Sequence, residues 1–273
     1  FHVSEVDRFV IDANSRISLS NNDGNTANTV FGKNAFTNSG TVLGDVGADG
    51  NVAIGESAMG TGTTLVAVNN TAVGRNALED ITTGDGNVAI GSYVLKEMQT
   101  GLSNVAIGGN DAVTEGAMEV STAAGQCIAI GTGALGSGVV TAAANGTVSV
   151  GYKSLFALTS GAGNTAIGLS ALATINTGAR NIGIGQYAMT HSDTANDNIA
   201  IGYGAMWDTN SGGDAQDSDH NIAIGSLAMS GAWADAKSEY NVAIGSNTMI
   251  GVLNGALYNV GIGHSALSDL TTG

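Results

Sequence analysis

The sequence predicts an all-β protein, a parallel β-solenoid of about thirteen coils with a basic repeat of 17 residues. Three observations predict this fold. An Ala-Ile-Gly-like triplet recurs thirteen times, glycine interrupts every apolar run, and none of the 273 residues is proline. A fixed short period is typical of stacked repeats in which each unit contacts its neighbours. The lack of proline agrees with this fold, because proline cannot donate a hydrogen bond to a β-ladder.

The glycine that ends each triplet, called the marker glycine below, sets the register of the array. Successive markers lie 17 to 23 residues apart, so the longer steps indicate insertions, which we expect to form loops at the rim of the coils. The longest insertions, of six residues, precede Gly55, Gly131 and Gly225. The thirteen markers are Gly32, Gly55, Gly74, Gly91, Gly108, Gly131, Gly151, Gly168, Gly185, Gly202, Gly225, Gly245 and Gly263.

The three residues before each marker predict a short β-strand. The first and third are mostly Val, Ile or Thr, and side chains that alternate along a strand place these two on one face. The residue between them is small, usually Ala or Gly, so the opposite face must meet something close. A second apolar pair, such as Ala171-Leu172, follows the marker and predicts a second strand whose Leu or Met points inward.

Asparagine stands four residues before the marker in eleven of the thirteen copies. It tolerates the left-handed backbone of a tight turn and can hydrogen-bond to the next layer, which predicts a stacked ladder at a corner. Cys127 and Thr147 interrupt the column, and we expect Cys127, the only cysteine, to be buried rather than nucleophilic. The ladder comprises Asn28, Asn51, Asn70, Asn87, Asn104, Asn164, Asn181, Asn198, Asn221, Asn241 and Asn259.

Composition and charge exclude several classes of partner. Only 11% of the residues are charged, yet the net charge is −15, which disfavours nucleic acid and anionic membranes. No apolar run approaches the ~20 residues of a membrane span. A thin coil whose small-residue face is poorly suited to water favours close packing against identical chains. We therefore expect self-association, with threefold symmetry as the preferred form.

The repeats resemble two families. Segments such as Asn51–Gly55 and Asn241–Gly245 are similar to the head repeats of YadA-type trimeric autotransporter adhesins. They resemble still more the Asn-Thr-Ala-Ile-Gly-x-x-Ala-Leu arrays of bacteriophage tail fibres. The resemblance implies a left-handed β-roll, a parallel homotrimer, and a location in the virion or on a cell surface. The basic repeat of 17 residues is longer than the unit of the bacterial heads.

The same resemblance suggests how the chain is divided. Residues 1–27 are expected to be a lead-in segment, since Arg8–Ile17 resembles a short β-hairpin that precedes such arrays in phage fibres. Residues 28–273 are expected to form the repeat array. Because the chain begins at Phe1 and stops within a repeat, we interpret it as part of a longer protein.

Function is less determined than form. The resemblance implies a rigid shaft or receptor-binding segment of a phage tail fibre that attaches to a host-surface glycan or protein. The head of a bacterial adhesin is the alternative, and a polysaccharide-cleaving tailspike is disfavoured. We predict no enzymatic activity and no cofactor, because no pair of carboxylates faces a common groove and acidic pairs such as Glu79-Asp80 fall in turns.

Candidate binding residues are few. His2, His191, His220 and His264 lack metal-ligand spacing, and the Asp-rich insertion Gly212–Asp219 could gather calcium ligands but fits a solvated loop better. Aromatic residues cluster late in the chain and could form a glycan-binding strip, although covering coil corners or a subunit seam is the competing role. The proposed contacts are Trp207, Trp233, Tyr240, Tyr258 and His220.

Overall fold

The computed structural model describes residues 28–36, 47–60, 66–109, 116–208, 217–234 and 236–272. The predicted hairpin segment, residues 1–27, lies outside the described residues. Most of each six-residue insertion also lies outside the described residues, which do not include 37–46, 110–115 and 209–216.

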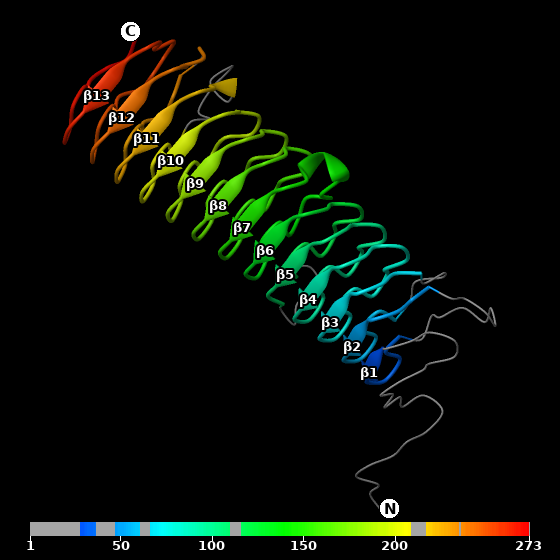
Figure 1. Cartoon of the computed structure of the whole chain (residues 1–273). Coiled ribbons are helices and arrows are strands. Elements are labelled where there is room, and N and C mark those ends of the chain that lie inside the picture. Colours follow the sequence, from blue (N-terminus) through cyan, green and yellow to red (C-terminus); the bar gives the residue numbers. More distant parts are fainter. Residues whose placement is uncertain are drawn as a thin grey trace, which may run out of the picture.

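The described chain is a parallel β-solenoid, as the repeat predicts. Thirteen strands of three residues form one sheet in strict sequence order, and every pair is parallel. Figure 1 shows them side by side along one axis, with β1 and β13 at opposite ends. The strands are β1 (Thr29–Phe31), β2 (Val52–Ile54), β3 (Thr71–Val73), β4 (Val88–Ile90), β5 (Val105–Ile107), β6 (Ile128–Ile130), β7 (Val148–Val150), β8 (Thr165–Ile167), β9 (Ile182–Ile184), β10 (Ile199–Ile201), β11 (Ile222–Ile224), β12 (Val242–Ile244) and β13 (Val260–Ile262).

Helical structure is nearly absent from the described residues. The 3₁₀ helix η1 (Ala142–Ala144) occupies the insertion between β6 and β7. No helix in the described ranges is long and apolar enough to cross a membrane.

The strands present their small residue to the inside of the coil. The middle residue of every strand is buried within a single chain, as at Ala72 and Ala89, while the first and third residues are half-buried or exposed. The prediction that sister chains cover the Ala and Gly face is therefore wrong. Strand alternation fixes which residues share a face, but it does not fix which face points inward.

The inward face is small because the second apolar pair fills the space beside it. The Leu or Met of that pair is buried, as predicted, at positions such as Leu78 and Leu172. At Gly183, a Cβ atom would lie 2.7 Å from Cγ of Leu172. The leucine or methionine of one coil therefore packs against the strand that follows it in the chain, and the long side chain requires a small partner.

The predicted second strand does not form. The segment after the marker is a turn in which two residues adopt left-handed backbone, for example Asn76 (φ 56°) and Leu78 (φ 51°). Its amide groups still bond to neighbouring coils: Asn76 donates to the carbonyl of Glu56 at 2.9 Å, and Leu78 to that of Val94 at 3.1 Å. Both Ala77 and Leu78 are buried, and consecutive residues of a regular strand cannot point to the same side.

Candidate functional site

The asparagines form a buried column along one corner of the solenoid. Asn87 Oδ1 accepts hydrogen bonds from the backbone amide (3.0 Å) and from Nδ2 (2.9 Å) of Asn104. Asn87 Nδ2 in turn donates to Asn70 Oδ1 at 3.0 Å and to the carbonyl of Gly101 at 2.8 Å. Such side chains satisfy backbone groups that the corner would otherwise leave buried without partners. The column therefore holds the coils together, and its side chains are not open to a ligand.

Two residues interrupt this column. Cys127 is buried, and its backbone amide donates to Asn104 Oδ1 at 3.0 Å, so it ends the first run of asparagines. Burial raises the pKa of the Cys127 thiol, which disfavours the thiolate that a nucleophile needs. Thr147 closes its own corner by donating from Oγ1 to the carbonyl of Ala144 at 2.8 Å.

An exposed apolar surface runs along the sheet. The outward first and third residues of the thirteen strands, called the strand stripe below, are mostly Val and Ile. Large exposed apolar patches on a soluble protein indicate contact sites. At ~4.8 Å per strand, the stripe extends on the order of 60 Å. Its most exposed apolar members are Phe31, Ile90, Ile128, Ile130, Ile167, Ile244, Val260 and Ile262.

Three of the predicted glycan contacts stack at a corner next to the asparagines. The ring centroids of His220 and Tyr240 are 4.8 Å apart, and those of Tyr240 and Tyr258 are 5.2 Å apart, with nearly parallel planes. Charged side chains occupy the same column in the preceding coils. His220 Nε2 lies 3.8 Å from Asp197, whose carboxylate accepts two hydrogen bonds from Arg180 at 2.7 and 2.6 Å. These bonds hold the pKa of Asp197 below its usual value.

The two tryptophans lie in different environments. Trp233 is fully buried in the described chain, so its predicted role in glycan contact is wrong. Trp207 is 40% exposed and belongs to a second group of aromatic residues, separate from the corner stack. Its ring lies 6.1 Å from Tyr187 and 6.4 Å from His191, in both cases nearly parallel. Tyr203 meets Tyr187 edge-on at 6.3 Å.

We call Tyr187, His191, Tyr203 and Trp207 the aromatic platform. The sequence shows these aromatic residues clustering late in the chain, but it does not predict them as one group. Counting from the marker glycine does not reveal the group, because Tyr187 and His191 occupy different positions in their coil from those of Tyr203 and Trp207 in the next. The missing information was the turn after the marker, which brings these positions onto one surface.

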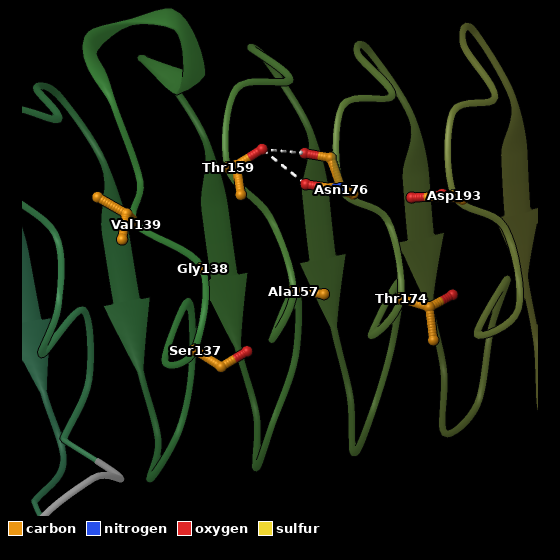
Figure 2. A pocket seen from close by; sticks show the side chains of 8 residues that line it. All are labelled: Ser137, Gly138, Val139, Ala157, Thr159, Thr174, Asn176 and Asp193. Atoms are coloured by element: carbon orange, nitrogen blue, oxygen red, sulfur yellow. Dashed lines mark hydrogen bonds between the residues drawn. The ribbon is translucent and has the colours of Figure 1, made fainter.

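A shallow groove of about 500 Å³ lies on the connecting segments of the middle coils. Figure 2 shows its side chains, including the hydrogen bonds from Thr159 to Asn176. The lining combines apolar surface with hydroxyl, amide and carboxylate groups. The lining residues are Ser137, Gly138, Val139, Ala157, Thr159, Thr174, Asn176 and Asp193.

The sequence predicts that the acidic and histidine side chains of the described residues lack metal-ligand spacing. No group of three or more His, Cys, Asp and Glu side chains among these residues could hold a metal ion. Of the Asp-rich insertion, residues 212–216 lie outside the described ranges, and the remaining carboxylates bond to a neighbouring coil. Asp217 accepts a hydrogen bond from Thr194, and Asp219 accepts one from the amide of Asn196 at 2.5 Å. The calcium alternative for this insertion therefore has no cluster in the described residues to support it.

Comparisons with known proteins add no further identification. The chain matches no protein-family model, no curated protein and no solved structure.

Proposed function

We propose that this chain is a structural fibre segment, a rigid shaft or receptor-binding part of a phage tail fibre that works as a parallel homotrimer. The resemblance of its repeats to tail-fibre arrays supports the setting. The observation that carries the proposal is the strand stripe, an apolar surface that continues along the whole described rod. Covering it requires a partner of the same length and the same repeat.

A second copy of the chain meets both requirements. Parallel copies side by side place Val and Ile opposite Val and Ile in every coil, so the contact repeats at the coil spacing. At ~60 Å long and roughly 10 Å wide, the stripe offers on the order of 600 Å² per chain, comparable to the ~800 Å² per partner of a stable interface. Three left-handed coils around one axis form the arrangement that the family resemblance implies, and it removes the stripe from water on all three chains.

The trimer is tested by placing charge on the stripe. We expect the double variant Ile167→Asp, Ile184→Asp to sediment as a monomer, because burying carboxylates in an apolar seam is costly. Val139→Asp is the matched control: Val139 is 50% exposed, more than Ile167, but it lies on a connecting segment outside the sheet. We expect this control to keep the trimer mass in analytical ultracentrifugation. A monomeric unaltered protein at micromolar concentration, or a stripe variant with unchanged mass, would overturn the proposal.

The biological setting has its own test. Antibodies raised against the assembled protein, used for immunogold electron microscopy of the source culture, should label the tail fibres of phage particles. Label on the outer surface of bacterial cells would instead support the adhesin alternative.

A further inference from the structure

We propose that the groove and the aromatic platform together form one binding site for a linear, uncharged glycan. This inference rests on the proposed attachment function, to which it adds a site and a class of ligand. It follows from how the two surfaces join, from the geometry of the rings and from the local charge.

The groove leads directly into the platform. Thr174 lines the groove, and His191 occupies the same position in the next coil, 17 residues later. Thr174 Oγ1 donates to the carbonyls of Thr190 (2.6 Å) and Ser192 (3.4 Å), the two residues that flank His191. The amide of His191 then donates to the carbonyl of Trp207 at 3.2 Å. Successive hydrogen bonds thus connect the groove to the platform, coil by coil along the axis.

The platform offers flat apolar area that remains open in the single chain. The ring planes of Tyr187 and Trp207 differ by 21°, and those of His191 and Trp207 by 27°. Tyr203 and Trp207 are 48% and 40% exposed. Rings that served the core would be covered, as Trp233 is, whereas open and nearly parallel rings suit the C–H faces of a sugar.

The groove supplies the polar half of the site. Thr159, Asn176 and Asp193 fill one column of successive coils, with Thr174 beside them. Hydroxyl, amide and carboxylate groups therefore repeat along the groove at the coil spacing of roughly 4.8 Å. A polymer that carries hydroxyl groups at regular intervals can bond to such a row, while one ring packs on the platform. Apolar walls with a few placed polar groups are the usual composition of a small-molecule site.

The charges indicate an uncharged ligand. The groove lining contains Asp193 and no lysine or arginine, and Asp208 follows Trp207 directly. Lys153 lies over the rings of Tyr152 and Phe156 at 5.2 Å, so its charge is directed at those aromatic faces. With a net charge of −15 on the whole chain, a sulfated or uronic-acid polymer would be repelled from this surface.

Affinity electrophoresis of the full protein through gels containing soluble polysaccharides tests the site. The probes are dextran, a linear galactan and a linear mannan, with dextran sulfate as the anionic match to dextran. We expect retardation by at least one neutral polymer and none by dextran sulfate. In the double variant Trp207→Ala, Tyr203→Ala, we expect binding to that polymer to weaken by roughly tenfold, the loss of one to two ring contacts. Tyr152→Ala is the control and should bind unchanged, since Tyr152 is 47% exposed, nearly as open as Tyr203, but belongs to neither the platform nor the groove lining.

Three results would overturn the site: no retardation by any neutral polymer, stronger retardation by dextran sulfate, or unchanged binding by the platform variant. The mass of each sample is measured in parallel. If the platform variant loses trimer mass, the rings belong to the subunit seam and the glycan site is wrong. If the unaltered protein is a trimer that binds no neutral polymer, only this inference fails and the proposed fibre remains.

Discussion

Two positions in the repeat both place residues at positive φ, yet one is constant and the other is freely varied. The marker position is glycine in all thirteen coils, with φ between +120° and +141°. The position five residues earlier, here called the corner column, has φ near +60° and holds Gly163, Arg180, Asp197, His220 and Tyr240 in successive coils.

The difference between them is steric. A Cβ atom on Gly168 would lie 2.6 Å from the carbonyl oxygen of Gly185, whereas a Cβ on Gly163 would meet nothing closer than Cγ of Arg180 at 3.8 Å. Coils approach one another so closely at the marker that no side chain fits. At the corner column the side chain points into open space, so this position can present ions or rings without disturbing the stack. Constancy in the repeat therefore marks the scaffold, and variation marks the surface.

The largest expected effect breaks the marker. Gly168→Ala should lower stability by roughly 3 kcal/mol or more, because it combines a forbidden φ with a clash against backbone that cannot move aside. Gly163→Ala, in the same coil, should cost only about 1 kcal/mol, the penalty of left-handed backbone without a clash. Thermal midpoints followed by circular dichroism compare the two. Equal midpoints would refute the steric explanation.

The asparagine beside the corner column should show a smaller effect. Asn87→Ala leaves the backbone amide of Asn104 without its acceptor and the buried carbonyl of Gly101 without its donor. We expect it to lower the free energy of unfolding by about 2 to 3 kcal/mol. Ser103→Ala changes the corner column of the next coil and should stay within ~0.5 kcal/mol. Urea midpoints measure both variants. If they were equal, the asparagine column would be only a conformational preference for a turn.

The smallest effect concerns the ion pair in the corner column. Arg180 lowers the pKa of Asp197, so the pair contributes stability above the unfolded pKa near 4 and loses it as the pH falls through the lower folded pKa. Arg180 is largely exposed, so Asp197→Asn should cost less than ~1 kcal/mol at pH 7. The difference should shrink as the pH falls through the lowered pKa of Asp197, and it should also shrink in high salt. In an Arg180→Gln background, the same change should have no further effect, and a persisting effect would assign Asp197 another role.

The sequence specified the array and left the candidate site incomplete. The marker glycines and the asparagine column can be found by counting, because each has a local requirement that recurs in every coil. His220, Tyr240 and Tyr258 could be placed in one stack for the same reason, since they share a column. The platform could not, because Tyr187 and Trp207 occupy different positions of the repeat and meet only through the turn that follows the marker. Trp233 lies in an irregular insertion, where the position relative to the marker glycine gives no information about burial.

By itself, the sequence determined the period of the repeat, the stacking of coils in sequence order and the residues that must stack. These features depend on backbone conformation and hydrogen bonding within one repeat. Only the tertiary structure decided that alanine faces inward and that valine and isoleucine face outward. The alternation of large and small residues is the same for either choice, and the outcome depends on where Leu172 and its equivalents fit. Their backbone turns them into the coil, so the space beside each strand is already filled, and the larger residues of the strand are left on the surface that we assign to neighbouring chains.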